Sequence, residues 1–421
     1  MIPMQTNLDN LIYIIGNQQT VDKIDAQPVM EPFADEVVTF LSAVSNAILD
    51  NKEAGVYPDV ITFTFWCRRA SVEIMKKEYV KAHGGIEESE NNTSINSRPI
   101  QYGRGCVFHI APSNVPVNYA YSLVVGLLAG NTNIVRLPSK YFPQVNLINS
   151  GIKTAIEEYP QFAPYICMVE YGHEKEVTDY FSLKCDTRVI WGGDNTIAEI
   201  RKSPLKPRAN EITFADRYSI SVIDSRKYLE MDDKERIASN FYNDTYLFDQ
   251  NACTSPRIVI WLGEEETCRK SQETFWSKLM PLVEGKFVLH SVQAVSKLAS
   301  VYKIGANFDG VRLNEAVSYK PSNKLIRVQV QKLSQGLMEY RNNSGFFMEY
   351  YAENLKEIEP LCVDKCQTLS YLGVSREEIK QFLVDSKPRG VDRVVLIGKT
   401  MNFDLVWDGY DLIGQLTRIV V

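Results

Sequence analysis

The chain has 421 residues and a formal net charge of -6 at pH 7. One hydrophobic core stops growing at about 250–300 residues, so we expect more than one domain. Hydrophobic residues make up 45% and charged residues 23%, which excludes a mainly disordered chain, and the acidic balance excludes a protein built to coat nucleic acid.

The cysteines and the apolar stretches indicate the compartment. The eight cysteines show no paired spacing, which favours free thiols in a reducing environment over a disulfide framework. The N-terminus lacks the basic region and apolar core of a signal peptide, and the most apolar helical stretch, 119–129, is far shorter than the roughly 20 residues that span a membrane. We therefore expect a soluble, cytoplasmic protein with no membrane span.

In chain order, the first hundred residues predict a helix at 33–49 and a polar loop at 84–99. Beyond residue 103, short apolar runs alternate with amphipathic segments, a pattern typical of parallel strands joined by helices in nucleotide-binding α/β folds. The expected strands are 107–111, 133–137, 165–170, 187–191 and 218–223, and the expected helices are 117–129, 145–158, 174–183 and 195–202.

A second α/β unit is expected to begin near residue 224. Its expected helices are 232–248, 266–282 and 291–301, and its expected strands are 257–262, 324–331 and 345–351. The last segment is too apolar for a loose tail. We therefore predict an N-terminal region with a nucleotide-binding domain at 1–223, a second domain at 224–385, and a C-terminal segment at 386–421 that returns to the first domain or to a partner subunit.

The turn PSNVP (112–116) follows an apolar strand and is fixed by two prolines. Asn114 between them presents an amide at the carboxyl end of that strand, where open α/β sheets bind ligands. A fixed amide N–H suits an oxyanion, because it polarises a carbonyl group without ionising. The alternative is that Asn114 caps the following helix, which is a common role for asparagine.

Two further segments follow expected strands. Gly192 and Gly193 precede a helix start and would let a cofactor diphosphate or nicotinamide approach the backbone, although a plain turn needs the same glycines. The dinucleotide fingerprint G-x-G-x-x-G is absent. Arg136 and Lys140 suit an adenosine ribose or a 2′-phosphate, and solvated surface charges are the alternative.

Cys253 lies between an expected long helix and an expected buried strand, and small residues flank it in NACTSP (251–256). A thiol in such a place is a nucleophile without a serine-type base if local dipoles lower its pKa, and a buried inert thiol is the alternative. Cys362 and Cys366 have no matching second pair and the four histidines show no ligand spacing, so we expect no metal site. His109, on an apolar strand, is expected to be a core residue rather than a base.

Together these segments resemble the aldehyde dehydrogenase superfamily. The order and spacing of APSNVP (111–116), IWGGDN (190–195) and QNACTSP (250–256) carry that likeness. More narrowly, VFHIAPSNVPVN, NIVRLPSK, RYSISVI, DQNACTSPRIV and RGVDRVVLIGKTMNFDLVWDGYDLI are similar to the LuxC-type acyl-CoA reductases, which are fatty acid reductases. The resemblance covers residues 100–421 and implies an aldehyde dehydrogenase-like α/β fold, with two Rossmann-like three-layer units (a cofactor domain and a catalytic domain) and a C-terminal docking or oligomerisation segment.

The resemblance implies NADPH-dependent reduction of a long-chain acyl thioester, on coenzyme A or on a protein, to the fatty aldehyde. Cys253 falls on the family's nucleophile, whose thiolate attacks the acyl carbonyl and expels coenzyme A. Asn114 falls on the superfamily's oxyanion asparagine, which acts together with the Cys253 backbone N–H. A homo-oligomer and an acyl-transferring partner subunit are also implied.

The resemblance implies an NADP(H) site as well. Counting from Gly130 puts the superfamily's ribose-contacting lysine at Arg136, whereas counting back from Pro138 puts it at Leu137. The candidate residues on the cofactor side are Ser113, Arg136, Lys140, Gly192 and Gly193.

The sequence departs from the superfamily at two glutamates. Hydrolytic aldehyde dehydrogenases carry a glutamate that activates the deacylating water; alignment of RYSISVI puts that position near Thr213, and Glu211 lies two residues away. The second, cofactor-side glutamate is missing near KCQTLSYLG (365–373). Without a water-activating base, a thioacyl enzyme persists for a thiol or a hydride, which favours reduction over hydrolysis. Two alternatives stay open: a cofactor-independent cysteine acyltransferase or thioesterase, and a catalytically silent scaffold subunit of an acyl-processing complex.

Overall fold

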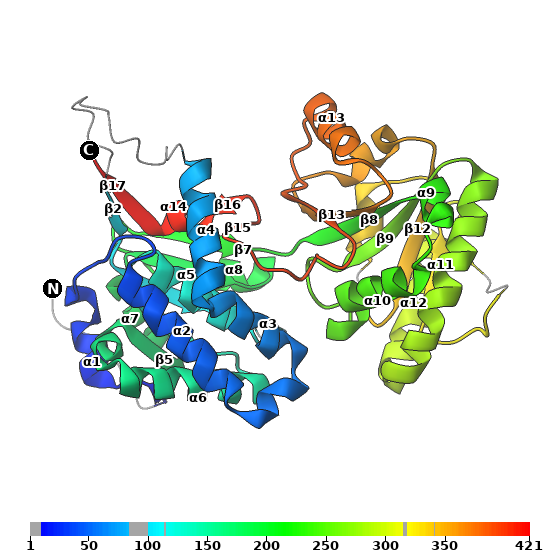
Figure 1. Ribbon diagram of the computed structural model, residues 1–421. Helices are drawn as coiled ribbons and strands as arrows, with labels where there is room; N and C mark the ends of the chain where they lie inside the picture. The colour runs from blue at the N-terminus through cyan, green and yellow to red at the C-terminus, as the bar shows by residue number, and fades with distance from the viewer. Residues whose placement is uncertain (1–9, 84–99, 113–114, 315–317, 341) are drawn as a thin grey trace. The chain divides into compact units, whose positions relative to one another are not determined.

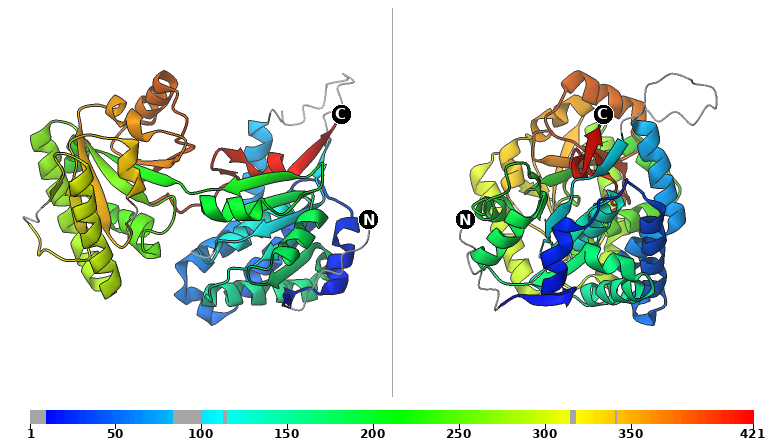
Figure 2. Two further views of the ribbon diagram at one scale, coloured as in Figure 1. Left: turned by 180° about the vertical axis from the view of Figure 1, so that it is seen from behind. Right: turned by 90° about the vertical axis from the view of Figure 1, so that its left-hand side faces the viewer.

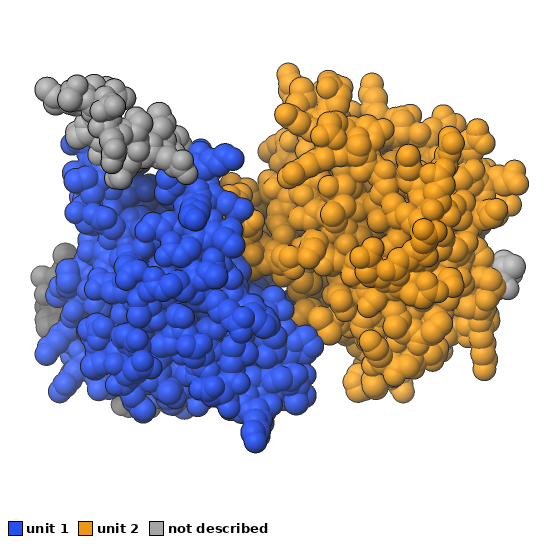
Figure 3. Space-filling view, in the orientation of Figure 1, with its two compact units in different colours: residues 1–215, 410–421 blue, residues 216–409 orange. Residues whose placement is uncertain are grey.

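The computed structural model describes residues 10–83, 100–112, 115–314, 318–340 and 342–421. These residues form two compact units, which Figure 3 colours separately. Unit 1 comprises the chain up to Ala215 together with Tyr410–Val421, and unit 2 comprises Asp216–Gly409. Each unit is built around its own mostly parallel sheet (Figure 1).

The sheet of unit 1 has six strands in the order β1-β5-β4-β3-β6-β7. β1 pairs antiparallel with β5, and the other strands run parallel. The central strand β3 is buried along its whole length, because helices cover both of its faces and leave no side for polar residues. The strands are β1 (Ile12–Ile15), β3 (Cys106–Ile110), β4 (Thr132–Arg136), β5 (Ile166–Glu170), β6 (Thr187–Trp191) and β7 (Asn210–Phe214).

Helices pack on both faces of this sheet (Figure 2). One face meets α1, α7 and α8, where Val21, Phe181 and Ile197 pack with Phe108 of β3. His109, the next residue, points to the opposite face, which α5 covers and against which α2 and α6 pack in turn. The helices of unit 1 are α1 (Gln18–Lys23), α2 (Asp35–Leu49), α3 (Pro58–Cys67), α4 (Arg69–Ala82), α5 (Asn118–Leu128), α6 (Pro143–Glu158), α7 (Lys175–Lys184), α8 (Asp194–Ile200) and α14 (Leu412–Leu416).

The last residues of the chain belong to unit 1. β17 (Thr417–Val420) pairs antiparallel with β2 (Ile100–Gly103). In the preceding α14, Leu412, Ile413 and Leu416 are buried. The docking is also polar, since the Asn131 side-chain amide donates to the Leu416 carbonyl at 3.0 Å.

The sheet of unit 2 has seven strands in the order β10-β11-β12-β9-β8-β13-β14. β10 is antiparallel to β11, and the remaining pairs are parallel. One face packs on α9, α10 and α11, and the other on α12 and α13. The strands are β8 (Tyr218–Asp224), β9 (Pro256–Leu262), β10 (Arg312–Leu313), β11 (Ile326–Gln329), β12 (Phe346–Ala352), β13 (Cys366–Leu372) and β14 (Arg393–Leu396); the helices are α9 (Ser225–Glu230), α10 (Lys234–Thr245), α11 (Glu265–Lys286), α12 (Ser291–Asn307) and α13 (Arg376–Ser386).

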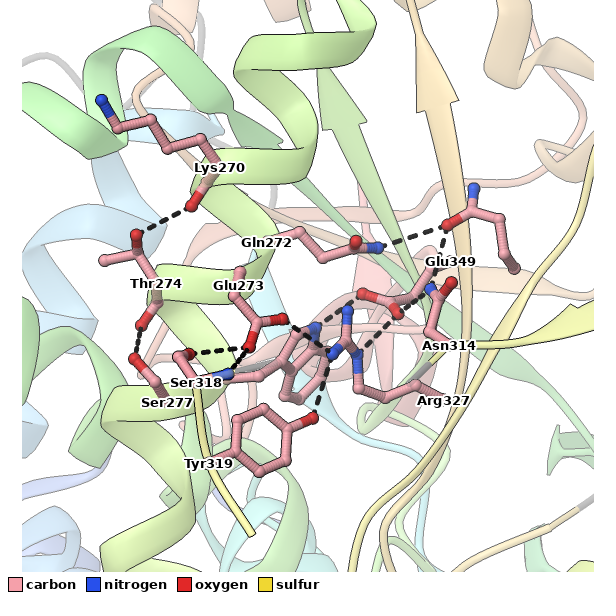
Figure 4. Close-up of polar contacts among 12 residues, drawn as sticks. Lys270, Gln272, Glu273, Thr274, Ser277, Asn314, Ser318, Tyr319, Arg327 and Glu349 are labelled. Atoms are coloured by element: carbon pink, nitrogen blue, oxygen red, sulfur yellow. Dashed lines mark hydrogen bonds and ion pairs between the residues drawn. The ribbon is translucent and has the colours of Figure 1, made fainter. Parts of the chain in front are cut away.

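The interior of unit 2 contains a polar network between α11 and strands β11 and β12. Glu349 of β12 is fully buried and accepts hydrogen bonds from Arg327 at 2.8 Å, from Asn314 at 2.7 Å and from the indole of Trp276 at 2.6 Å. Figure 4 shows the Arg327 guanidinium between Glu349 and the Tyr319 hydroxyl, to which it donates at 3.0 Å. The charge of Glu349 is therefore paired and fully hydrogen-bonded, as a buried carboxylate requires.

The elements predicted from the sequence are present, with their ends shifted, but their division between the units differs. The strand expected at 218–223 is β8, and it pairs with β9 and β13 in the second sheet rather than ending the first unit. The second unit extends to residue 409, beyond the expected 385. Elements that the sequence did not predict individually include strands β1, β2, β7 and β13 and helices α1, α3, α4, α9 and α13. The polar loop expected at 84–99 lies outside the described residues.

Among the helices that the structure describes, none is both long enough and apolar enough to cross a membrane.

Candidate functional site

The loop that carries Cys253 connects α10 to β9 at the amino edge of the second sheet. Asp249 and Gln250 both have positive φ angles, 53° and 58°, which turn the chain sharply after α10. The buried Gln250 amide donates to the carbonyls of Pro256 and Phe346, at 3.0 and 3.1 Å, and accepts from the N–H of Gly345 and Phe346. Gln250 thus fastens the cysteine loop to the start of β12.

Cys253 differs from the other cysteines in its exposure. Seven of the eight cysteines are buried, whereas Cys253 keeps partly exposed surface. Its backbone is held from β8, where the Ser219 hydroxyl donates to the Cys253 carbonyl at 2.7 Å. The residue as a whole is therefore partly exposed although its sulfur is buried, and the two alternatives, a nucleophile and an inert thiol, both stay open.

The surroundings of the Cys253 sulfur hold it as a thiol. Burial of the sulfur and, next, the negative charge of Asp408 raise the pKa of Cys253 to about 12. A hydrogen bond from the Gln367 side chain and the positive charge of Arg217 act in the opposite direction. A pKa lowered by local dipoles was the expectation from the sequence; in the structure, desolvation outweighs the effects of Gln367 and Arg217 and raises the pKa.

These four residues, Cys253, Arg217, Gln367 and Asp408, form what we call the Cys253 cluster. Gln367 of β13 is fully buried, and its amide donates to the Asp408 carboxylate. Sequence reasoning missed Arg217, Gln367 and Asp408, because they come from segments far from the cysteine loop. Two of them lie in segments that the sequence comparison already singled out: Gln367 in KCQTLSYLG (365–373), where the superfamily glutamate is missing, and Asp408 in the C-terminal block.

Ser113 and Asn114 lie outside the described residues, so the structure places neither. The following helix α5 begins at Asn118, and the position before it, the N-cap, is Val117. The cap position of this helix is thus occupied by Val117 and not by Asn114, and the oxyanion role of Asn114 stays a prediction.

Lys140 lines a hollow at the carboxyl edge of the first sheet, between the ends of β4 and β5. The hollow has a volume of about 400 Å³, and Leu137, Glu170 and Tyr171 also line it. Arg136 supports its wall: the guanidinium lies 4.5 Å from the centre of the Tyr171 ring and donates to the Gly172 carbonyl. Arg136 and Lys140 thus lie near the same hollow; Lys140 is exposed, whereas Arg136 is partly buried and hydrogen-bonded to the backbone.

Gly192 and Gly193 form the turn from β6 into α8. The Gly192 N–H donates to the Phe214 carbonyl at 3.2 Å, and a Cβ atom at Gly192 would meet Thr196 at 3.0 Å. Gly193 is the N-cap of α8 with ordinary extended backbone angles. The turn is therefore narrow and partly exposed, at the same carboxyl edge as Arg136.

Two other titratable residues have structural roles. His109 is buried, bonds Ser122 and Asn133, and has its pKa lowered to about 4 by burial, which confirms that it is a core residue. Glu211 binds Arg188 at 2.5 Å and Arg201 at 2.7 Å, so its carboxylate is committed to two ion pairs. Among the described residues, no three His, Cys, Asp or Glu side chains are grouped to hold a metal ion.

The fold is that of the aldehyde dehydrogenases. Indole-3-acetaldehyde dehydrogenase in complex with NAD+ matches with a TM-score of 0.64 and 12% identity, over 96% of this chain and 87% of that one. Lactaldehyde dehydrogenase matches with a TM-score of 0.63 and 14% identity, over 96% and 90%. A 3,6-anhydro-L-galactose dehydrogenase matches with a TM-score of 0.60 and 13% identity, over 96% of this chain and 90% of that one. The fold class expected from the sequence is confirmed.

Within that fold, the chain belongs to the LuxC family of acyl-CoA reductases, whose model matches residues 48–280, including the cysteine loop. A long-chain acyl-protein thioester reductase of Vibrio harveyi is 24% identical over 332 residues, which is 76% of this chain and 64% of that protein. A protein of the same description from Aliivibrio fischeri is 24% identical over 164 residues, 38% of this chain and 33% of that protein. The chain thus spans less than two thirds of the length of these relatives.

Proposed function

We propose that the protein reduces long-chain fatty acyl thioesters to aldehydes with NADPH, through a thioacyl intermediate on Cys253. The observation that carries the proposal is Cys253 itself. It is the one cysteine that is partly exposed as a residue, it lies on a loop that Gln250 holds, and it falls inside the segment that matches the acyl-CoA reductase family. Membership of that family supports the reaction class.

In the proposed reaction, the Cys253 sulfur bonds to the acyl carbonyl carbon and the carbon–sulfur bond to coenzyme A, or to an acyl-carrying protein, breaks. The sulfur gives up its proton before the attack, and the departing thiolate gains one. The Cys253 backbone N–H and the Asn114 amide are the proposed donors to the oxyanion. NADPH, when bound, supplies the hydride that reduces the thioacyl group, and the resulting thiohemiacetal collapses to aldehyde and free Cys253.

The structure of β7 supports reduction over hydrolysis. Thr213 stands where the sequence alignment puts the water-activating glutamate, and it carries no carboxylate. Glu211, two residues earlier, is neutralised by Arg188 and Arg201. Neither Thr213 nor the ion-paired Glu211 carboxylate is therefore a free base on β7 for the activation of water.

The residues of unit 1 fit a nicotinamide dinucleotide. The hollow beside Lys140 has room for an adenosine ribose, and the exposed ammonium group would hold a 2′-phosphate. The narrow turn at Gly192 and Gly193 lies at the same carboxyl edge, where open α/β sheets bind nucleotides. We propose NADP(H) as the cofactor on these grounds.

The decisive experiment uses the purified full-length chain with a series of acyl-CoA thioesters. Wild type should oxidise NADPH and release aldehyde, and without NADPH it should gain the mass of one acyl group. Cys253→Ala should show neither, whereas Cys268→Ala, which removes a buried thiol in the same unit, should retain both. An acyl adduct that forms but is consumed without nucleotide would favour the acyltransferase or thioesterase, and no adduct at all would favour the scaffold.

The substrate carrier and the assembly are further proposals. The name of the Vibrio harveyi relative supports acyl-protein thioesters as donors beside acyl-CoA, and so an acyl-transferring partner subunit. A homo-oligomer and a cytoplasmic location stay predictions. Light scattering on the purified chain measures the first, and fractionation of cells measures the second.

A further inference from the structure

Two polar side chains of α12 reach the start of the cysteine loop at Asp249. The Gln293 amide donates to Asp249 Oδ2 at 2.7 Å. The Lys297 ammonium group donates to the Ser344 carbonyl at 2.6 Å, and the Ser344 N–H donates to the Asp249 carbonyl at 3.3 Å. Cys253 follows Asp249 on the same loop. α12 is therefore connected through both side chains to the loop that carries the candidate nucleophile.

The burial of Lys297 is unusual for a helix at the surface of the unit. Lys297 is only 2% exposed, whereas the apolar residues Val292 and Val295 of the same helix are exposed. A lysine is rarely buried to this degree unless its charged group is hydrogen-bonded or paired. The ammonium group meets that requirement through the carbonyls of Ser344 and Asn323. Because an apolar side chain would fill this position without the cost of burying a charge, packing alone does not account for the lysine.

The backbone that these contacts hold is strained. Asp249 and Gln250 have positive φ angles, and so do Ser344 and Gly345, at 63° and 80°. Three of these four residues have side chains that disfavour this conformation, and such residues keep it only where neighbouring groups hold them. The Gln250 amide fastens the two turns to each other, and α12 supplies the further contacts at Asp249 and Ser344.

Lys297 carries its charge at neutral pH. Burial lowers the pKa of Lys297 to about 8, against the negative charge of Asp249, which raises it. The ammonium form therefore predominates at pH 7, and its hydrogen bonds to the two carbonyls are charge-assisted. On the neighbouring elements, Lys324 pairs with Glu284 of α11 at 3.3 Å, so Asp249 is the charged group that acts on Lys297.

We propose that Lys297 and Gln293 are positioning residues, which hold the cysteine loop in the conformation that places Cys253. Loss of either contact lets the strained turn at Asp249 and Gln250 relax, and the rest of the loop moves with it. The buried sulfur is then exposed to solvent more often, and its position is less well defined.

This positioning has a consequence for the reaction, and that consequence rests on the proposed function. Attack on a thioester needs the sulfur within a narrow range of positions, and in a looser loop the sulfur spends less time there. Lys297→Met should therefore lower kcat for acyl-CoA reduction about tenfold or more. KM for NADPH should stay unchanged, because the candidate cofactor residues belong to unit 1.

The test measures alkylation of Cys253 by iodoacetamide, followed by peptide mass, with neither acyl-CoA nor nucleotide present. Lys297→Met keeps the length of the side chain and removes its charge, so alkylation at pH 7 should become about tenfold faster, the effect of one lost hydrogen bond from a charged group. Gln293→Glu keeps the acceptor that caps α12 but puts a second carboxylate against Asp249, so it should also react faster. Lys303→Met, the same change at an exposed lysine of α12, should match wild type within about twofold.

The pH dependence separates a charged positioning group from loosened packing. Above pH 8 the wild-type Lys297 loses its charge and donates weaker hydrogen bonds, so the ratio of the Lys297→Met rate to the wild-type rate should fall several-fold between pH 7 and 9.5. The ratio cancels the titration of the thiol itself. A ratio that is the same at every pH, or alkylation of both variants no faster than that of Lys303→Met, would overturn the proposal.

A failure of this inference can be told from a failure of the proposed function, because alkylation uses neither substrate nor cofactor. Faster alkylation of the variants together with a wild type that reduces no thioester would count against the proposed function alone. Normal reductase activity and unchanged alkylation in the variants would count against the positioning residues alone. Should Lys297→Met not fold, the rate of Gln293→Glu beside that of Lys303→Met decides, and equal rates would overturn the proposal.

Discussion

Cys253 is partly exposed as a residue, but its sulfur is buried and held as a thiol. With its pKa raised to about 12, the thiolate is a very small fraction of the protein at neutral pH. Burial is the largest cause of the raised pKa; of the charged groups that act on the sulfur, Asp408 disfavours the thiolate and Arg217 favours it.

At the scale of single residues, sequence reasoning found the nucleophile but not the groups that surround it. Cys253 can be recognised from the sequence because its signs are local: small residues flank it, and it lies between an expected helix and an expected strand. Gln367 comes near the cysteine loop because β13 pairs with β8, and Asp408 is hydrogen-bonded to Gln367; a single sequence gives no sign of either relation. The sign of the pKa shift was equally hidden, since burial by distant segments causes it.

Lys140 is the residue on which cofactor selection should depend. Lys140→Ala should raise KM for NADPH about tenfold or more, because a charged hydrogen bond to a phosphate contributes about 1.5–3 kcal/mol. KM for NADH should change far less, because NADH has no 2′-phosphate. Steady-state kinetics with both nucleotides measure the difference.

The matched control is Lys153→Ala, which removes an exposed lysine of α6 in the same unit and should change neither KM. Equal losses with NADPH and NADH would contradict a phosphate contact at Lys140.

Glu170 also lines the hollow, and its negative charge repels a phosphate bound there. Glu170→Gln should therefore lower the KM for NADPH, which the same steady-state kinetics measure.

At the scale of elements, the second sheet is held together partly by buried charge. Glu349 and Arg327 lie on neighbouring strands, β12 and β11, and both are almost completely buried. Replacing one partner leaves the other charged and unpaired in a medium that solvates it poorly. The pair therefore makes the register of these strands costly to change.

Arg327→Met should lower the free energy of unfolding by about 3–5 kcal/mol, the usual cost of breaking a buried ion pair from one side. Equilibrium unfolding in urea measures it. Arg269→Met removes an arginine from the exposed pair with Glu265 on α11 and should leave the midpoint unchanged. Equal free energies of unfolding for the two variants would show that the network in Figure 4 does not stabilise the sheet.

Strands that are apolar runs bounded by turns could be predicted from the sequence. Strands whose polar residues are buried only by neighbouring strands and helices could not. β3 and β9 are short apolar runs bounded by turns, which is the pattern of a strand covered on both faces. β7 has only two buried residues in five, and β13 is rich in polar residues that are buried by its neighbours. β8 was assigned to the first unit because it continued the alternation of strands and helices after 187–191 and 195–202, although its partners lie beyond residue 255.

At the scale of the whole molecule, the chain leaves unit 1 after residue 215 and returns to it at residue 410. Unit 1 is therefore incomplete until the last segment has been added, although all six strands of its main sheet precede residue 215 and β17 joins only the separate two-stranded sheet with β2. The sequence indicated the return through its apolar composition. It did not indicate the partner, β2, which is 4 residues long and has no strong strand pattern.

Deleting residues 412–421 should unfold unit 1. The deletion removes the buried Leu412, Ile413 and Leu416, each contributing roughly 1.5–3 kcal/mol by burial, so the sum is comparable with the whole ~5–15 kcal/mol stability of a typical domain. It also leaves the Asn131 amide and the Arg104 N–H without the Leu416 carbonyl. Deleting only 419–421, which are exposed, should lower the melting temperature slightly. Thermal unfolding of the two truncated chains beside the full chain tests this, and equal melting curves for all three would show that unit 1 folds without its returning segment.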